Sequence, residues 1–509
     1  MFQEIPITGK YLMIPVRNQG DMIPVIFSGN DMTIPLNLIP GTREDCDFIA
    51  SYPLHFFGNT LRIDGENLDW LSEVTQSDLP ATAPYDCPER QQFHYSATTG
   101  WLNDPNGLHW YNGEWHMFHQ YNPLSNDWEN MHWYHAVSSD LVHWKELGVT
   151  IPPLPCGTAF SGGAVIDWQN TSGLQEDPLY PPILLFYTAH IRKNNRPAHT
   201  QHLFYSTDGG KNYRKYSDEP IIGTFGDGGD RDPSVAWDPV HDEWLMALYL
   251  GDSNREFALL RSDDLIHWQE IQRFLMPDQG RECPELLWMR DDASGDYYWV
   301  LLEANGNYLV WERQNGTMHP ISEGKFLRPG KEYYGYACQT FTNAPDGVTG
   351  IGWQRSRIRH AAFSHSMTLP FQLRLCAGKL FVFPHPALET LRTGATEWND
   401  LQPGTPISAG NGLWELELTL PASGELDLSL CGIPLSFRKD TLQLGNDIFD
   451  RPADAGTFRI FLDRTSVEIF AANGAFWCAQ DAKQDLSLPL IAASGSIPHL
   501  RIYPLSAIR

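Results

Sequence analysis

Three acidic residues lie in segments whose composition differs from that of a charged, solvated surface. Asp104 lies in the run WLNDPNG, Asp232 in RDP and Glu282 in ECP, so that turn-forming residues stand close to each carboxylate. Taken singly, each segment has an ordinary structural interpretation: a turn, an ion pair and a strand end. Brought together in one site, the three carboxylates could perform nucleophilic and acid–base chemistry.

Hydrolysis of a glycosidic bond needs such a set. One carboxylate attacks the anomeric carbon or activates water, and a second protonates the leaving oxygen. A third carboxylate can hold hydroxyl groups of the sugar. The three segments are far apart in the sequence, so the elements that carry them must bring them to one place.

An imperfect repeat in the middle of the chain indicates how they could meet. Residues 138–144 (SSDLVHW) recur as 262–268 (SDDLIHW), with a looser copy at 206–213 (STDGGKNY). Apolar, strand-like runs accompany these turns at residues 114–118, 183–187, 243–248 and 298–302. Strands and turns repeated in this way are typical of the blades of a β-propeller, whose inner strands converge on a central funnel.

The chain as a whole is predicted to be all-β, because long stretches of helical periodicity are missing. Residues 1–88 are expected to form a small accessory β domain, in which residues 11–16 and 22–26 flank a turn and predict a hairpin. Residues 89–375 are assigned to the propeller. Alternating apolar residues after this point predict a C-terminal β-sandwich over residues 380–509.

The composition and net charge of the 509-residue chain exclude some classes of function. Hydrophobic residues make up 42% and charged residues 19%, which is typical of a globular chain. The net charge is −26 and no Lys/Arg-rich run reverses it locally. Neither nucleic acid nor a membrane is therefore an expected partner.

The eight cysteines are scattered without paired spacing, so neither a zinc site nor a disulfide framework is predicted. The first residues lack the basic and apolar regions of a secretory signal peptide. The expectation is a cytoplasmic protein, or a periplasmic or secreted one if the N-terminus has been trimmed.

Over residues 93–505 the chain resembles glycoside hydrolase family 32, the invertases, inulinases and levanases. The resemblance lies in short motifs that follow the family's order. In the propeller region these are residues 101–107 (WLNDPNG), 118–123 (FHQYNP), 128–136 (WENMHWYHA), 160–163 (FSGG), 231–233 (RDP), 282–284 (ECP), 336–337 (YA), 350–353 (GIGW) and 366–370 (SMTLP). Residues 463–470 (DRTSVEIF) and 473–474 (NG) resemble the family's late signature. Each motif is weak alone, but the ordered set is specific.

The resemblance implies a five-bladed β-propeller followed by a β-sandwich, no metal or organic cofactor, and transfer of a fructosyl unit to water. By position, Asp104 is the nucleophile, Glu282 the general acid/base and Asp232 the residue that holds ring hydroxyls and stabilises the transition state. The fructosyl pocket would be lined by Asn103, Gln120, Trp128, Ser161 and Arg231. The implied partner is a small or polymeric fructoside, namely a fructan such as levan or inulin, a fructo-oligosaccharide or sucrose. Association of the β domains into a homo-oligomer stays open.

Glu282 must donate a proton while Asp104 remains ionised, so the two carboxyl groups need different environments. The neighbours Cys283 and Pro284, with the aromatic-rich surroundings, predict that burial desolvates Glu282. If another carboxylate held the acid/base role, Glu285 would be the first candidate.

Several positions depart from the family pattern. Glu129 and Tyr134 stand where glycine is frequent, Gly163 where serine is frequent, and Phe371 and Gln372 where Arg-Glu is usual. We expect these residues near the rim of the pocket, where they would affect chain-length and linkage preference.

Four alternatives remain beside hydrolysis that releases fructose. The same fold could support an endo-acting levanase or inulinase, or a fructosyltransferase. Residues 206–210 (STDGG) resemble the Asp-box turns of sialidases, and a sugar-binding propeller without activity is the fourth. The presence of both Asp104 and Glu282 argues against the last. Residues 10–16 (KYLMIPV) resemble the start of N-terminal modules on some bacterial fructan hydrolases, which favours fructans as substrates.

Overall fold

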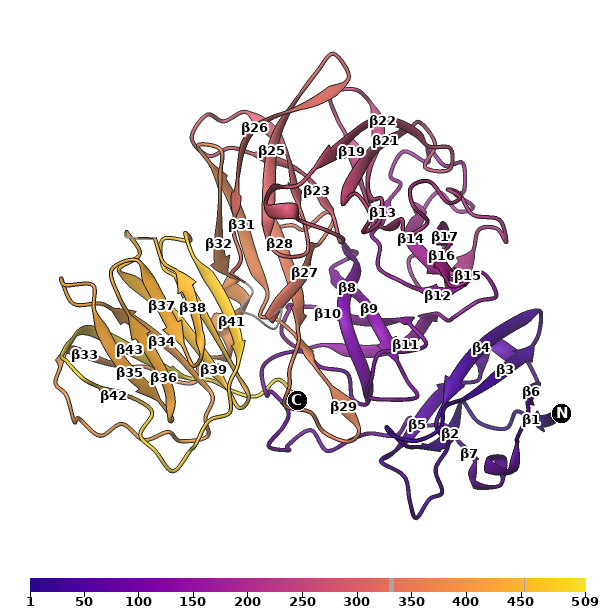
Figure 1. Cartoon of the computed structure of the whole chain (residues 1–509), viewed down its shortest axis with the longest axis horizontal. Coiled ribbons are helices and arrows are strands. Elements are labelled where there is room, and N and C mark those ends of the chain that lie inside the picture. Colours follow the sequence, from indigo (N-terminus) through magenta and orange to yellow (C-terminus); the bar gives the residue numbers. More distant parts are fainter. Residues whose placement is uncertain (329–333, 453) are drawn as a thin grey trace.

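Five consecutive antiparallel sheets occupy the middle of the chain in the computed structural model, which describes residues 1–328, 334–452 and 454–509. Their inner strands contact one another in sequence order, and the fifth contacts the first, so the sheets close into a ring (Figure 1). The protein is therefore a five-bladed β-propeller with further sheets at both ends of the chain. The inner strands are β8 (Gly100–Tyr111), β13 (Ala164–Ile166), β19 (Arg231–Asp238), β23 (Glu285–Arg290) and β27 (Tyr334–Thr340).

The apolar runs seen in the sequence form the second strand of four blades. Most residues of these strands are buried, because neighbouring blades pack on both of their faces. They are β9 (Glu114–Asn122), β14 (Ile183–His190), β20 (Glu243–Tyr249) and β24 (Tyr297–Leu302). The other blade strands are β10 (His132–Ser138), β11 (Lys145–Ile151), β12 (Thr158–Ala159), β17 (Thr200–Ser206), β18 (Arg214–Lys215), β21 (Glu256–Ser262), β22 (Gln269–Leu275), β25 (Asn307–Gln314), β26 (Thr317–Lys325), β28 (Val348–Gln354), β29 (Phe363–Ser364), β30 (Ser366–Met367), β31 (Phe371–Cys376) and β32 (Lys379–Pro384).

The repeated SxDLxHW segments are the same turn in two blades. In the first, Asp140 Oδ1 accepts the backbone N–H of His143 at 2.8 Å, and the Trp144 indole donates to the Leu141 carbonyl at 3.0 Å. In the third blade, Asp264 accepts the N–H of His267 at the same distance. The blade interpretation of the repeat is thereby confirmed, since both turns join the two outer strands of a sheet.

The N-terminal sheets correct one prediction. The strands in residues 11–16 and 22–26 do not form a hairpin, because β2 (Tyr11–Val16) pairs with β5 (Phe48–Pro53) and β7 (Thr75–Ser77). In contrast, β3 (Ile23–Gly29) pairs with β4 (Met32–Leu38) and β6 (Thr60–Gly65), and β6 also pairs with β1 (Phe2–Pro6). Apolar side chains of both strands enter one shared core, so the two sheets face each other and the turn between them crosses from sheet to sheet.

Two further sheets form the C-terminal β-sandwich, at the left of Figure 1. Apolar side chains from both sheets fill the core between them. The six-stranded sheet contains β33 (Thr396–Leu401), β43 (Ile497–Pro504), β34 (Trp414–Thr419), β39 (Thr457–Asp463), β40 (Ser466–Ala471) and β41 (Trp477–Asp481); the five-stranded sheet contains β38 (Asp447–Asp450), β37 (Thr441–Leu444), β36 (Ile433–Phe437), β35 (Leu426–Leu430) and β42 (Ala492–Ala493).

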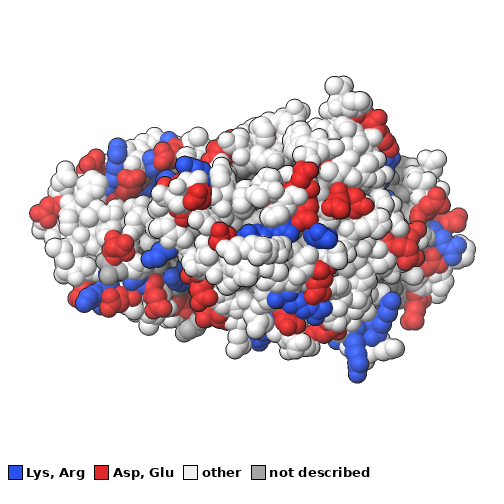
Figure 2. Space-filling model, turned by 90° about the horizontal axis from the view of Figure 1, so that it is seen from above, with Lys and Arg blue, Asp and Glu red and all other residues white. Residues whose placement is uncertain are grey.

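The remaining elements are short. They are the strand pair β15 (Arg192–Lys193) and β16 (Arg196–Pro197) and the 3-10 helices η1 (His55–Phe57), η2 (Asp69–Glu73), η3 (Pro277–Gln279) and η4 (Pro386–Leu391). Within the described ranges, no helix has the length and apolar character needed to span a membrane. On the face shown in Figure 2, acidic side chains form several groups with basic side chains among them.

A buried charged cluster joins the sandwich to the propeller. His94, in the segment before β8, contacts Asp463 through Nδ1 at 2.8 Å and Glu468 through Nε2 at 3.0 Å. The same carboxylates accept backbone N–H groups of Phe93 and Leu369. Burial lowers the pKa of His94, but its hydrogen bonds to the two carboxylates outweigh that effect and raise the pKa to about 9. The imidazolium therefore offsets one of the two buried negative charges, and the backbone N–H donors further stabilise the carboxylates.

We predict that His94→Ala lowers the free energy of unfolding by about 3–5 kcal/mol, because it leaves buried carboxylates without their cation. The contribution of His94 is fully present below pH 6.5 and is lost as the pH rises through about 9, since folding raises its pKa. Urea unfolding midpoints of the wild type and of His94→Gln, measured between pH 6 and pH 9.5, would show a steeper alkaline loss in the wild type. Parallel curves would contradict the role given to His94.

Candidate active site

The three acidic segments meet at one end of the propeller channel. Asp104 lies in β8, Asp232 is the second residue of β19, and Glu282 comes shortly before β23. The Cys283 thiol contacts Asp104 Oδ2 at 3.7 Å and Asp232 Oδ2 at 3.5 Å. Burial raises the pKa of this thiol, and the charges of Asp232, Asp104 and Glu282 add to that effect.

The backbone around these carboxylates is strained. Asp232, Glu282 and Cys283 have φ values of 65°, 47° and 46°, in the left-handed region that non-glycine residues rarely adopt. Such conformations cost about 1–3 kcal/mol each and cluster at functional sites. Here they are held in place by backbone hydrogen bonds: Cys283 N–H donates to Asp232 Oδ2 at 2.9 Å, and Asp232 N–H donates to Thr188 Oγ1 at 2.9 Å.

A chain of side-chain hydrogen bonds leads to Asp104. The Trp101 indole donates to Asn103 Oδ1 at 2.7 Å, and Asn103 Nδ2 donates to Gln120 Oε1 at 2.9 Å. Gln120 Nε2 then donates to Ser161 Oγ at 2.6 Å. Finally, Ser161 Oγ donates to Asp104 Oδ2 at 2.7 Å. Three residues expected from the sequence in the pocket, Asn103, Gln120 and Ser161, are thus connected to Asp104 through one network.

Glu282 is held from two sides. Arg231 donates to Glu282 Oε2 through Nε at 3.1 Å and Nη2 at 2.9 Å, while the Tyr336 hydroxyl donates to Oε1. Tyr336 comes from the inner strand of the fifth blade. Sequence analysis named Tyr336 in a motif but assigned it no role. Its position on an inner strand could have identified it as a site residue.

Burial raises the pKa of Asp104 to about 6, with Ser161 opposing this effect and the charge of Glu282 adding to it. Burial also raises the pKa of Asp232 to about 7, against the opposing charge of Arg231. The expectation of a desolvated Glu282 is wrong, because its side chain keeps 25% exposure, compared with 5% for Asp232, and is paired with Arg231.

Trp128 lies at the rim and does not contact the carboxylates directly. Its indole is 46% exposed and meets the ring of Phe160, the neighbour of Ser161, at 5.8 Å between centroids. The Phe160 ring in turn stacks on His190 at 4.1 Å. An exposed indole fixed in this way offers a flat apolar face on which a sugar ring can stack.

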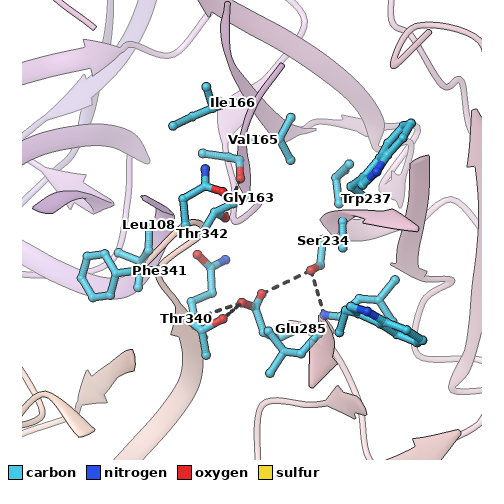
Figure 3. A pocket seen from close by; sticks show the side chains of 18 of the residues that line it. Leu108, Gly163, Val165, Ile166, Ser234, Trp237, Glu285, Thr340, Phe341 and Thr342 are labelled. Carbon is cyan, nitrogen blue, oxygen red and sulfur yellow. Dashed lines mark hydrogen bonds between the residues drawn. The ribbon is translucent and has the colours of Figure 1, made fainter. Parts of the chain in front are cut away.

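The other end of the channel contains a separate cavity of about 370 Å³ (Figure 3), whose lining does not include Asp104, Asp232 or Glu282. Glu285 lies at its wall, accepting the Thr340 N–H at 2.9 Å and the Ser234 hydroxyl at 3.2 Å. Burial raises the pKa of Glu285 to about 7. This carboxyl group joins strands of three blades and faces away from the catalytic candidates.

The departures from the family pattern do not all lie at the rim, as expected from the sequence. Gly163 lines the cavity at the other end of the channel, and Phe371 is buried in a core shared with the sandwich. The Tyr134 hydroxyl donates to Glu146 at 2.9 Å, on the side of the first blade. Glu129 remains at the rim, beside Trp128.

The arrangement suits hydrolysis by two carboxyl groups with a third to hold the sugar. Within the ranges that the structure describes, no group of three or more His, Cys, Asp or Glu side chains could hold a metal ion. The side chains that the structure brings together at the site are the three carboxylates, Arg231, Tyr336 and the amide network.

Known proteins resemble the chain in sequence and in structure. The levanase of Bacillus subtilis (strain 168) is 29% identical over 510 residues, covering 86% of this chain and 73% of the levanase. The invertase of Schizosaccharomyces pombe (strain 972) is 33% identical over 356 residues, covering 65% of this chain and 57% of the invertase. The crystal structure of exo-inulinase from Aspergillus awamori shares the fold, with a TM-score of 0.72 and 23% identity over 84% of this chain and 100% of that one.

Residues 94–384, more than half of the chain, match the family model described as the glycosyl hydrolases family 32 N-terminal domain. This match removes the sialidase alternative and agrees with the order of motifs along the propeller. The chain belongs to glycosyl hydrolase family 32.

Proposed function

We propose that the protein hydrolyses β-D-fructofuranosides with retention of configuration and releases fructose from fructans, fructo-oligosaccharides and sucrose. The observation that carries this proposal is the convergence of Asp104 and Glu282 on one end of the channel in different surroundings. Ser161 donates to Asp104, whereas Arg231 and Tyr336 hold Glu282. The relatives named levanase and invertase support the choice of fructosides.

In this mechanism Asp104 attacks the anomeric carbon while Glu282 gives its proton to the leaving oxygen, so that the glycosidic bond breaks and a covalent fructosyl intermediate forms. Glu282, now deprotonated, takes a proton from water, which attacks the same carbon and frees Asp104. Asp232 accepts hydrogen bonds from ring hydroxyls, and these bonds strengthen as the ring approaches an oxocarbenium-like state. Asn103, Gln120, Ser161 and Arg231 surround the fructosyl unit, and Trp128 stacks on it.

The acid/base role is tested with Glu282→Ala. This variant should lose at least about two orders of magnitude in rate on sucrose and fructans, whose leaving groups need protonation. It should lose much less in the glycosylation step with an activated aryl fructoside. Added azide should restore turnover and yield a β-fructosyl azide, because azide attacks the intermediate without help from a base. The measurement is product analysis by chromatography and NMR.

Two control variants sharpen this test. Asp104→Asn lacks the nucleophile and should respond neither to the activated leaving group nor to azide. Glu285→Gln changes a buried carboxyl group three residues after Glu282. This variant should keep kcat within about threefold of the wild-type value, since Glu285 faces the cavity at the other end of the channel. Azide rescue in Glu285→Ala instead of Glu282→Ala would transfer the acid/base role to Glu285.

The pH profile tests the environment of Asp104. Asp104 must be ionised to attack, and its pKa is raised to about 6, so kcat/KM should fall as the pH drops below this region. The Ser161 hydroxyl stabilises the ionised form and lowers the pKa of Asp104. Ser161→Ala should therefore move the acid limb to higher pH, whereas Ser161→Thr, which keeps a hydroxyl, should move it less. An acid limb that stays in place in Ser161→Ala would show that another group limits the rate there.

A further inference from the structure

The N-terminal sheets, strands β1 to β7, share a hydrophobic core with the rim of the propeller. Leu124, Ala362 and Phe363 of the catalytic region are buried in the same cluster as the inward side chains of β2 and β3. The Tyr52 hydroxyl of β5 also lies 3.1 Å from His132 Nε2 in the first blade. The N-terminal module is therefore packed against the propeller over a continuous apolar contact.

The module holds the rim segment, residues 124–130, which carries Trp128. Asn37 of β4 exchanges two hydrogen bonds with Asn130: its N–H donates to Asn130 Oδ1 at 2.8 Å, and Asn130 Nδ2 donates to its carbonyl at 2.7 Å. Asn126 N–H donates to Asn18 Oδ1 at 3.0 Å. The rim segment is thus fixed to the module on both sides of Trp128.

Two departures from the family pattern lie at this contact. Glu129 Oε1 accepts a hydrogen bond from Asn37 Nδ2 at 3.2 Å. Tyr134 lines, together with Tyr11 and His55, the narrow space between the module and the first blade. The two residues that replace the family's frequent glycine therefore both lie at the contact with the N-terminal module.

A polar cleft of about 510 Å³ lies between the module and the propeller rim. The module contributes Arg17 and Gln19 to its lining, and the propeller contributes Asp127 and Arg359. Guanidinium, amide and carboxylate groups of this kind form the hydrogen bonds that sugar hydroxyls require. Because hydrogen bonds fix the two walls to each other, a ligand would meet a preorganised surface.

A chain of contacts connects the cleft to the hydrogen-bond network of Asp104. The Arg359 guanidinium is 5.4 Å above the Trp101 ring, and the indole of Trp101 donates to Asn103. Arg359 also forms an ion pair with Asp127 at 2.6 Å, beside Trp128 in the sequence. The cleft is therefore lined by the residue next to Trp128 in the rim segment.

We infer that the N-terminal module is part of the substrate site, and that its cleft with the rim segment binds additional sugar units of a polymeric fructan. This inference rests on the proposed function, since it assigns the cleft to the same substrate. A disaccharide fills only the catalytic funnel, whereas a polymer reaches the cleft as well. Binding of fructan should therefore depend on cleft residues, and hydrolysis of sucrose should not.

The test is the double variant Arg17→Ala/Gln19→Ala in the full-length chain. Both residues are exposed, and the Arg17–Asp45 ion pair at 3.3 Å is solvated, so the variant should fold normally. We expect KM for levan or inulin to rise about threefold to tenfold, as for the loss of one or two hydrogen bonds, with kcat/KM for sucrose unchanged. The matched control is Gln76→Ala, which removes hydrogen bonds to Thr8, Gly9 and Pro6 inside the same module and should leave both substrates unaffected.

Retardation of the protein in gels that contain levan or inulin gives a second readout, which needs no catalysis. The double variant should be retarded less than the wild type and the Gln76→Ala control. Equal retardation of all three proteins, or an equal rise of KM for sucrose and polymer, would overturn the inference. Failure of the wild type to release fructose from any fructoside would refute the proposed function instead, and the retardation measurement would still decide the role of the cleft.

Discussion

Three carboxyl groups at one end of a narrow channel repel one another, and much of the structure serves to hold them there. Arg231 offsets part of this repulsion through its contacts with Glu282, while burial raises the pKa values of Asp104 and Asp232. The left-handed backbone at Asp232 and Glu282 adds strain at the same place. Charge and strain of this kind persist only in a surrounding structure that cannot relax.

Closure of the propeller ring supplies that rigidity. Each inner strand contacts its two neighbours, and almost fully buried second strands lie behind four of them. Glu285 shows the contrast between the two ends of the channel. Its carboxyl group accepts hydrogen bonds from Thr340 and Ser234 and so ties neighbouring blades, whereas Asp104 keeps part of its side chain open to the funnel. The same residue type stabilises the ring at one end and is available for chemistry at the other.

Sequence reasoning succeeded where the signal is local. The repeated turns and apolar second strands are encoded in short segments, and the blades that they predict do bring Asp104, Asp232 and Glu282 to one end of the channel. It failed where the answer depends on distant partners. Strands β2 and β3 look like a hairpin in the sequence, but the packing of one sheet on another places them in different sheets. The partners of Glu282, Arg231 and Tyr336, come from other blades. A short segment of sequence does not show which distant residues will contact it.

Under the proposed function, a funnel that takes one fructosyl unit would gain the same contacts from that unit in a disaccharide and in a polymer. Preference for a long substrate must therefore come from contacts outside the funnel, and these contribute only if they are ordered before binding. A rim loop alone loses conformational freedom when a ligand arrives. The hydrogen bond that Asn18 accepts from Asn126 and the one that Asn37 donates to Asn130 remove much of that freedom in the free protein. The position of the N-terminal module beside Trp128 thus gives a physical reason for an extra module on a propeller that already brings the three carboxylates together.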